Sequence, residues 1–553
     1  MKMKKLLPIL VIVIFFTCSN NEYKKINKRA DIDYLRNNNF VYLQDNKFKI
    51  NDTIFFPLML NYSVNFRKIN NKYVLSSLKD YENPNIFEGN TADSSLIVLK
   101  GHLQLIKELG FNSIRLVGLN IINTSENNPF ITVYNHTNEH LEINKDNYKI
   151  IFSAFKQFIE IADELDLRVM VLLKAPINNQ ELEDFTIALL KEYKDEPTIF
   201  AYDFMNEPLY FDNKDLKSDD RARTKESALE IVTNWKKIME KYAPNQMLTI
   251  GFSEPLEVFE WDPAILPVDF LAFHTYHPLR VPNEIYWYSK YIKKPWMIGE
   301  TALPADNDSV SYAEQTQFLK EVYKRAVNCG GIGLAWWSFQ DVEWGGFEHN
   351  YTSIMNHKGK TYTKDSTYCI LGTLKPVAYE FKNLSKYKPN YKCPCNSNYY
   401  NMLGYKNYVI FGKLVDENNN PVKGAVIRGW DNTWRVGVNS FSNENGEFTL
   451  YSNKEMFHFE ISAPKMTKIK FERNIKYYLS DKQSNITKDS LKNIDLEYHS
   501  ISYKPFLVDT TICDSNFVSI DEKSYIFNFK RDMFYNYIFK ANMGVLELEK
   551  INF

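Results

Sequence analysis

Between Ile54 and Ala335, short apolar runs alternate with longer segments in which apolar residues recur every three or four positions. This alternation is typical of βαβ units, which build a parallel sheet covered by helices. It predicts eight strands, at Ile54–Leu60, Ser113–Val117, Arg168–Leu173, Ile199–Met205, Met247–Gly251, Phe270–Phe273, Trp296–Gly299 and Gly333–Trp337. It also predicts amphipathic helices, at Leu96–Gly110, Ile150–Asp166, Glu226–Ala243 and Ala313–Val327. Eight such units fit an α/β protein built on a (β/α)8 TIM barrel, which we expect to span residues 46–385.

The composition is that of a folded protein with a large core, because 44% of the 553 residues are hydrophobic and 24% are charged. The formal net charge is −1, so no overall field favours nucleic acid or an anionic membrane surface as a partner. Aromatic residues reach 15%, and their flat amphipathic rings suit apolar faces, including those of sugars.

The first 18 residues read as an export signal, with three lysines before the apolar run Leu6–Phe16. That run is too short to span a bilayer. Thr17-Cys18 resembles the end of a bacterial lipoprotein signal, in which the cysteine is lipidated, so Cys18 is the expected anchor in the cell envelope, at the outer membrane or in the periplasm. Cleavage by the ordinary signal peptidase, followed by secretion, is the alternative. Residues 19–45 are polar and rich in Asn and Lys, as in a tether.

Five cysteines follow, at Cys329, Cys369, Cys393, Cys395 and Cys513. Their odd number and irregular spacing indicate neither a disulfide framework nor a zinc site. Residues 386–406 are rich in Tyr, Lys, Pro and Asn and are predicted to be an interdomain linker, where a local or cross-domain disulfide remains open.

Two glutamates follow predicted strands, Glu207 after the fourth and Glu300 after the seventh. In a (β/α)8 barrel the carboxyl ends of all strands meet at one rim, so we expect both side chains there. Two carboxyl groups across a cleft can hydrolyse a glycosidic bond, one attacking the anomeric carbon while the other transfers the proton. Asn206 and Glu207 are adjacent, so both can reach the cleft only if the strand is irregular there, and Pro208 is consistent with a break.

Several motifs in this order resemble the retaining glycoside hydrolases of clan A, and most closely glycoside hydrolase family 5. The likeness covers residues 55–339 and implies hydrolysis of β-linked oligo- or polysaccharides. It assigns Glu207, in Asn-Glu-Pro, as the acid/base and Glu300, in Gly-Glu, as the nucleophile. The further residues that the resemblance assigns to substrate or nucleophile contacts are Arg115, which holds the nucleophile ionised, Asn206, which donates to the sugar 2-hydroxyl, His274 and Tyr276 of the His-x-Tyr motif, and Trp337 beneath the sugar.

The resemblance implies no cofactor and no metal. A pair of histidines, His136 and His140, lies in an Asn-rich insertion without a helical pattern, which makes a metal site there improbable. Lys174 stands where family 5 members often carry a histidine, which leaves the sugar open. The loop after Asp341 contains residue types common at sugar subsites. A catalytically inactive glycan-binding barrel and a transglycosylase using the same site are the alternatives, and the presence of both glutamates favours an enzyme.

After residue 407 the sequence changes to short alternating segments separated by turns, as in a small antiparallel sandwich. Residues 407–500 resemble the carboxypeptidase regulatory-like domain, which has a transthyretin-like fold. Residues 501–553 alternate weakly, and the sequence does not decide whether they add strands.

Overall fold

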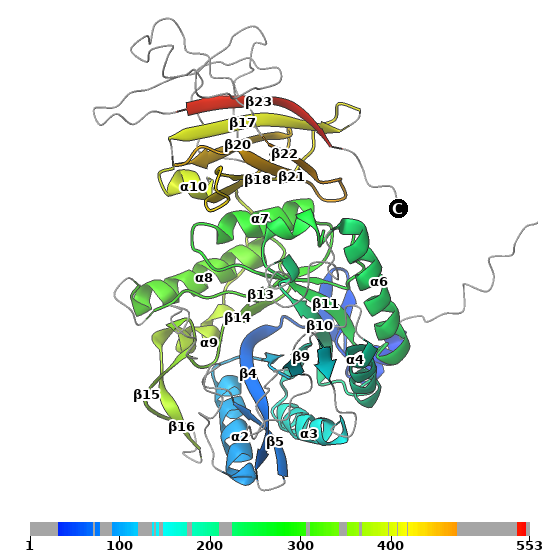
Figure 1. Ribbon diagram of the computed structural model, residues 1–553. Coiled ribbons are helices and arrows are strands. Elements are labelled where there is room, and N and C mark those ends of the chain that lie inside the picture. The colour runs from blue at the N-terminus through cyan, green and yellow to red at the C-terminus, as the bar shows by residue number, and fades with distance from the viewer. Residues whose placement is uncertain are drawn as a thin grey trace, which may run out of the picture.

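The computed structural model describes residues 31–69, 72–77, 91–119, 135–137, 140–142, 148–173, 180–209, 224–305, 310–341, 351–363, 368–395, 398–405, 407–416, 418–472 and 539–548. Figure 1 shows a ring of helices around a barrel, with a second, β-rich unit packed against α7 on one side. Within the described ranges, none of the helices combines the length and apolarity that a bilayer crossing needs.

Eight parallel strands form the barrel. They are β4 (Leu58–Ile69), β6 (Ser113–Val117), β9 (Arg168–Leu172), β10 (Ile199–Asn206), β11 (Met247–Phe252), β12 (Leu271–His274), β13 (Trp296–Glu300) and β14 (Leu334–Trp336). Each pairs with the next, and β14 returns to β4 with Leu334 opposite Leu58, which closes the sheet. The TIM barrel is therefore confirmed. Its first strand starts at Leu58 rather than Ile54, which belongs to β3 (Thr53–Ile54) of a separate small sheet.

Helices surround the barrel (Figure 1). They are α2 (Ala92–Glu108), α3 (Tyr148–Glu164), α4 (Gln180–Glu192), α6 (Lys225–Tyr242), α7 (Val281–Tyr291) and α8 (Tyr312–Asn328). Capping boxes at Thr91 and Ser311 satisfy the first amide groups of α2 and α8. The connection from β11 to β12 uses the short 3₁₀ helix η4 (Pro255–Phe259) instead of an α-helix.

A small N-terminal unit covers the amino-terminal end of the barrel. It consists of α1 (Ile32–Asn37), β1 (Tyr42–Gln44), β2 (Lys47–Ile50) and β3. Phe48 of β2 is fully buried against the rings of Phe200 and Phe270, at the starts of β10 and β12. The folded chain thus reaches into the predicted tether of residues 19–45. The difference arises because a few apolar side chains in that polar stretch, Leu35, Phe40 and Tyr42, are buried.

Further strands extend from the rim or lie outside it. They are β5 (Lys72–Ser77), antiparallel to the end of β4, β7 (Asn135–Thr137) with β8 (His140–Glu142), and β15 (Met355–Tyr362) with β16 (Cys369–Leu374). The chain then passes through η6 (Pro376–Glu380), which packs beside α8, and α9 (Phe381–Leu384), which packs on η6.

The C-terminal unit is a β-sandwich. One sheet holds β20 (Glu447–Ser452), β17 (Tyr408–Asp416) and β23 (Phe539–Leu548), and the other holds β19 (Gly437–Phe441), β18 (Val426–Trp430), β21 (His458–Ser462) and β22 (Ile469–Glu472). Ile410, Ile427, Leu450 and Ile461 meet in a separate core. β23 lies in the segment 501–553 that the sequence left open, and it adds to the sandwich by pairing in parallel with β17.

Polar contacts fix the sandwich to the barrel. The indole N–H of Trp287, on α7, donates to the carbonyl of Gly424 at 2.8 Å. The buried Lys225 ammonium binds both Asp262 of the barrel, at 2.9 Å, and the carbonyl of Ala463, at 2.8 Å. A Cys329–Cys393 disulfide joins the end of α8 to the predicted linker, which also contains α10 (Tyr399–Met402). The two units therefore pack directly on each other.

Candidate active site

The side chains of Glu207, His274 and Glu300 converge at the carboxyl ends of β10, β12 and β13. One carboxylate oxygen from each glutamate and one ring nitrogen of the histidine all lie within 4.8 Å of one another. These residues are far apart in the sequence, but they lie close together because all parallel strands of a barrel end at the same rim. The cluster therefore lies where catalytic residues of this fold lie.

Glu300 is held by two donors. The guanidinium of Arg115, on β6, forms an ion pair with one carboxylate oxygen, and the hydroxyl of Tyr276 donates to the other. Glu300 is only 5% exposed. Burial, together with the charge of Glu300, raises the pKa of Tyr276 well above its ordinary value, so this hydroxyl remains a donor. These contacts fix the Glu300 carboxyl group in one orientation.

Arg115 is fully buried and is the centre of a polar network. It donates to Asp203 at 2.7 and 3.0 Å, to Asn61 at 3.0 Å and to Asn206 at 2.8 Å. Burial by itself would lower the pKa of Arg115, but the charges of Asp203 and Glu300 outweigh it and raise the pKa. The guanidinium therefore stays charged beside Glu300.

Two members of this network, Asn61 and Asp203, were not found by sequence reasoning. Asn61 is the strand partner of Arg115 in the pairing of β4 with β6, and it also donates to the carbonyls of Gly299 and Trp336. Asp203 accepts from the amide of Gly251 at 2.9 Å. Their one sequence signal is a polar residue that directly follows apolar residues of a strand, because a polar group buried there needs a hydrogen-bond partner.

Glu207 leaves its strand in an unusual backbone conformation. The register between β10 and β11 shifts between Asp203 and Asn206, and Glu207 has a φ of +46°. Its amide donates to the carbonyl of Gly251 at 2.6 Å. Because of this bulge, Asn206 reaches Arg115 while Glu207 reaches His274. The predicted irregularity before Pro208 is therefore confirmed.

The Glu207 carboxyl group lies in a less polar setting than Glu300. Burial raises the pKa of Glu207 to about 7, although the positive charge of Arg115 acts in the opposite direction. Burial also lowers the pKa of His274 to about 4, so this ring is neutral near pH 7. His274 Nδ1 is hydrogen-bonded to Glu207 at 2.7 Å and lies 3.5 Å from Glu300. At neutral pH Glu207 is thus poised between its acid and base forms.

The His274 ring fits because two neighbouring residues lack side chains. A Cβ on Gly251 would lie 2.8 Å from Nε2 of His274 and 3.2 Å from the Arg115 guanidinium. A Cβ on Gly299 would lie 3.2 Å from the same ring. His274 Nε2 has no hydrogen-bond partner among the residues that the structure describes. An unprotonated Nε2 suits that position, which favours Nδ1 as the protonated nitrogen.

A second buried carboxyl group, Glu257 on η4, supports the segment after Glu207. It accepts from the amide of Leu209 at 3.1 Å and from the hydroxyl of Ser253 at 3.0 Å. Burial outweighs these hydrogen bonds and raises the pKa of Glu257 to about 8. Sequence reasoning missed this residue because no motif marks it.

Trp337 follows β14, and its amide donates to the carbonyl of Thr301 at 3.0 Å, which places it beside the Glu300 strand. Its side chain is half-buried and packs against the barrel core. Asp341, at the start of the loop expected to shape the subsites, is buried in an ion pair with Lys375 at 2.9 Å. Lys174 and the rest of that loop lie outside the described residues.

The cluster also has ligand types that metal ions bind, but its contacts point to another use. Both oxygens of Glu300 already accept hydrogen bonds, and the positive charge of Arg115 lies beside them. This arrangement suits an ionised carboxylate paired with a protonated neighbour rather than a bound cation. The expectation of no metal and no cofactor remains a prediction.

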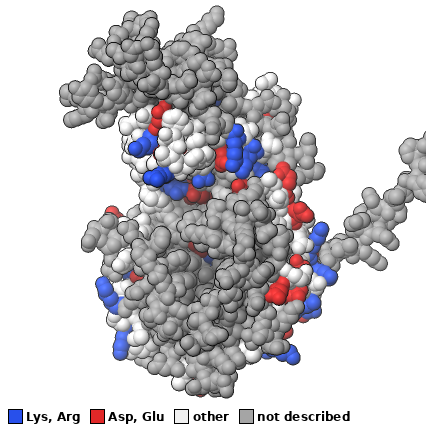
Figure 2. Space-filling view, viewed as in Figure 1, with Lys and Arg blue, Asp and Glu red and all other residues white. Residues whose placement is uncertain are grey.

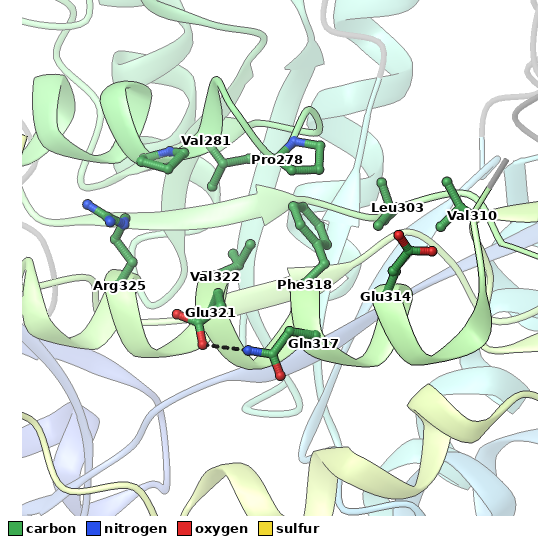
Figure 3. A pocket seen from close by; sticks show the side chains of 11 residues that line it. Pro278, Val281, Leu303, Val310, Glu314, Gln317, Phe318, Glu321, Val322 and Arg325 are labelled. Carbon is green, nitrogen blue, oxygen red and sulfur yellow. Dashed lines mark hydrogen bonds between the residues drawn. The ribbon is translucent and has the colours of Figure 1, made fainter. Parts of the chain in front are cut away.

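The described residues also form hollows outside this cluster, and their surface carries charges of both signs (Figure 2). A hollow of about 500 Å³ lies between α7 and α8, lined by Pro278, Val281, Leu303, Phe318 and Val322 among others (Figure 3). It contains none of the predicted site residues. Basic and acidic residues are interspersed on the described surface of the face drawn in Figure 2, in keeping with the net charge of −1.

No known protein family matches the chain, and no curated protein matches it. Solved structures resemble it weakly. Endo-1,4-beta-mannanase from Rhizomucor miehei is 13% identical over 63% of this chain and 100% of that protein, with a TM-score of 0.43. GH5_18 from Streptomyces cattleya, in complex with GlcNAc, is 14% identical over 59% and 81% (TM-score 0.42), and a beta-glucosidase from Thermotoga maritima is 12% identical over 60% and 97% (TM-score 0.38). Likeness at this level does not identify a function, and the barrel assignment rests on the strand register.

Proposed function

We propose that the chain is a retaining β-glycoside hydrolase, most like family 5, that cleaves β-linked glycans by double displacement. The observation that carries the proposal is the pair of glutamates at the rim, whose oxygens approach within 4.8 Å. Retaining glycosidases hold their two carboxyl groups about 5–5.5 Å apart, whereas inverting enzymes leave about 6.5–9.5 Å for a water molecule. The short separation supports direct attack by one carboxylate.

Glu300 is the proposed nucleophile. Its ion pair with Arg115 favours the charged form, and the Tyr276 hydroxyl orients the second oxygen. Attack on the anomeric carbon forms a glycosyl ester with Glu300 as the bond to the leaving oxygen breaks. Ester formation neutralises the charge of the Glu300 carboxylate, which weakens its pairing with Arg115. That pairing is restored when water releases the sugar.

Glu207 is the proposed acid/base. A pKa of about 7, raised by burial, keeps a large share of this carboxyl group protonated near neutrality, so it can donate to the leaving oxygen. After that transfer, the ionised Glu207 takes a proton from the incoming water. Neutral His274 holds the carboxyl group in place through both steps.

Two further residues are proposed to bind the sugar. The oxygen of Asn206 accepts from Arg115, which leaves its NH₂ group as a donor for the sugar 2-hydroxyl. Trp337 is proposed as the aromatic floor beneath the sugar at the cleavage point. Its position beside Thr301, the residue after Glu300, supports this assignment.

The test is the configuration of the first-formed product. Purified protein is screened against β-mannans, β-glucans, xylans and aryl β-glycosides, and proton NMR follows the nascent reducing end of the best substrate. Double displacement predicts the β anomer first, with the α anomer appearing only by mutarotation. Initial release of the α anomer would overturn the mechanism.

We also propose that the protein is exported and anchored in the cell envelope through lipidated Cys18. The motif Thr17-Cys18 after a short apolar run supports the anchor. Acyl chains would supply membrane affinity that a net charge of −1 does not. The wild-type protein should partition into detergent, and C18S should release or mislocalise it. A soluble wild-type protein with a different mature N-terminus would rule the anchor out.

A further inference from the structure

Trp434 occupies an exposed turn between β18 and β19, in a conformation that suits other residues better. The residue is 55% exposed and has a φ of +59°. Left-handed backbone is unfavourable for bulky side chains, and Gly or Asn usually fills such a position. Asp431 stabilises the turn by accepting from the amides of Arg435 and Val436 at 3.0 and 3.2 Å. The turn therefore presents a large ring to solvent at a conformational cost.

Two rings support Trp434. His458, on β21, stacks on it with ring centres 3.9 Å apart and planes 16° from parallel. Trp430, at the end of β18, lies 5.2 Å away and is the strand partner of His458. We call Trp430, Trp434 and His458 the aromatic platform. His458 covers one face of the indole, and Trp434 still remains 55% exposed.

The aromatic platform lies on the side of its sheet that faces the barrel. Side chains alternate along β18, with Ile427 in the sandwich core and Val426 in the barrel core. Arg428 and Trp430 share the side of Val426, and the Arg428 guanidinium lies 4.3 Å from the Trp430 ring centre. The platform thus continues the face that packs on the barrel.

Aromatic side chains connect this face with the catalytic rim. His277, which directly follows Tyr276, is exposed, and its ring contacts Tyr399 at 5.0 Å. Tyr399 and Asn439 line one small hollow at the junction, and Asn439 is the strand partner of Arg428, whose guanidinium lies over the Trp430 ring. A row of aromatic and polar side chains therefore runs from His277, beside Tyr276, across the junction to the platform.

We propose that the aromatic platform binds a β-linked glycan chain and extends the substrate contacts of the barrel onto the sandwich. The inference deepens the proposed function and rests on it for the class of ligand. Pyranose rings expose apolar C–H faces that stack on flat aromatic rings, and the platform carries charged neighbours able to bind hydroxyl groups. Continuity with the catalytic rim favours a glycan over a protein partner.

A matched pair of variants tests binding directly. Trp434→Asn removes the ring and places a residue that tolerates the left-handed backbone, so folding is expected to persist. Tyr391→Asn is the control, because Tyr391 is also exposed, at 75%, with a φ of +55°, but belongs to the linker. Both are made in full-length E300Q, so that substrate is not consumed, and affinity electrophoresis is run with β-mannan, mixed-linkage β-glucan and xylan.

We expect Trp434→Asn to weaken binding of at least one polysaccharide on the order of tenfold, as for an aromatic ring that the bound ligand buries. Tyr391→Asn should change binding less than about twofold. Thermal unfolding should show an unchanged or higher midpoint for Trp434→Asn. Equal binding by both variants would overturn the proposal. Loss of binding to an envelope protein, with polysaccharide binding intact, would overturn it in favour of a protein partner.

Activity separates this inference from the proposed function. In the active enzyme, Trp434→Asn should lower the ratio of kcat/KM on the bound polysaccharide to kcat/KM on an aryl β-glycoside, also on the order of tenfold. A protein that binds through Trp434 but cleaves no glycoside would refute the hydrolase and retain the platform. A protein that cleaves polysaccharide equally well with and without Trp434 would retain the hydrolase and refute the platform.

Discussion

The two carboxyl groups at the barrel mouth lie within 4.8 Å of each other in opposite surroundings. The Glu300 side is rich in charge, with Arg115 on one oxygen and Tyr276 on the other. The Glu207 side is dominated by burial and by a neutral His274. Two side chains of one chemical type thus lie in different surroundings, and for Glu207 burial raises the pKa to about 7.

The backbone creates this difference. Glu300 ends β13, whose register with β12 also shifts beside it, and Arg115 reaches the Glu300 carboxylate from β6. Glu207 follows a bulge and is itself in the left-handed conformation, and its carboxyl group is hydrogen-bonded to His274. A regular strand would place Glu207 on the opposite face from Asn206. The division of roles therefore depends on a local irregularity as well as on residue type.

Removing Glu300 should have the largest effect. Glu300→Ala deletes the atom that bonds to the sugar, so turnover of every substrate should be abolished, with partial recovery when azide supplies a small nucleophile. Steady-state assays with and without azide, on aryl β-glycosides, provide the measurement. Near-normal activity in this variant would show that the charge-rich side does not carry the nucleophile.

Removing Glu207 should have a smaller and more selective effect. Proton transfer is worth typically 10²–10⁴-fold, and aryl leaving groups that depart without a proton escape much of that loss in the first step. Glu207→Ala should therefore impair polysaccharide cleavage strongly while giving a burst of aryl release followed by slow hydrolysis. Equal loss on both substrates, with no burst and a normal fold, would contradict the assignment.

Most of the fold was predictable because buried parallel strands are continuous apolar runs, as in Arg168–Leu172 and Met247–Phe252. The first strand was predicted to start too early because apolar Ile54, Phe55 and Phe56 precede β4, and to end at Leu60 because polar Asn61 interrupts the apolar pattern. That residue is polar because it binds Arg115 inside the barrel. The N-terminal unit was missed because its buried side chains are sparse in a polar segment.

The candidate site was predictable where a motif marks it. Glu207, Glu300 and Tyr276 each belong to a motif at a strand end, and the structure brings them together. Asp203 and Glu257 have no such motif, and their partners, Gly251 and Leu209, lie about fifty residues away in the sequence. Such pairs follow from strand register and from loop conformation, neither of which a single sequence specifies.

A methyl group at Gly251 should disturb the contacts of both Glu207 and Glu300. Its Cβ would press on His274, which binds Glu207, and on Arg115, which binds Glu300. Gly251→Ala should lower kcat/KM on the order of tenfold to a hundredfold, because small displacements of catalytic groups are costly. Azide should not restore activity, since Glu300 remains. Gly330→Ala is the control. A Cβ on Gly330 would meet nothing within 4 Å, but the residue has a φ of +89°, so Gly330→Ala should lower the free energy of unfolding and leave activity unchanged.

The smallest expected effect concerns pH. Glu207 must be protonated to donate to the leaving group, and burial raises its pKa to about 7, so kcat/KM on polysaccharide should fall as the pH rises through about 7. An activated aryl glycoside should show a weaker decline over the same range. A decline centred near pH 4.5 would mean that burial does not set this proton affinity.

Glu257 offers a rival explanation of that decline, since burial raises its pKa to about 8 and it binds the segment after Glu207. Glu257→Gln removes this ionisation while keeping an oxygen that can accept from the Leu209 amide. If Glu207 controls the rate, the pH profile of Glu257→Gln should keep its basic limb within about half a unit of the wild type. If the limb disappears in this variant, Glu257 is the titrating group. The loss of activity at high pH would then report the ionisation of Glu257 in η4 and not that of Glu207.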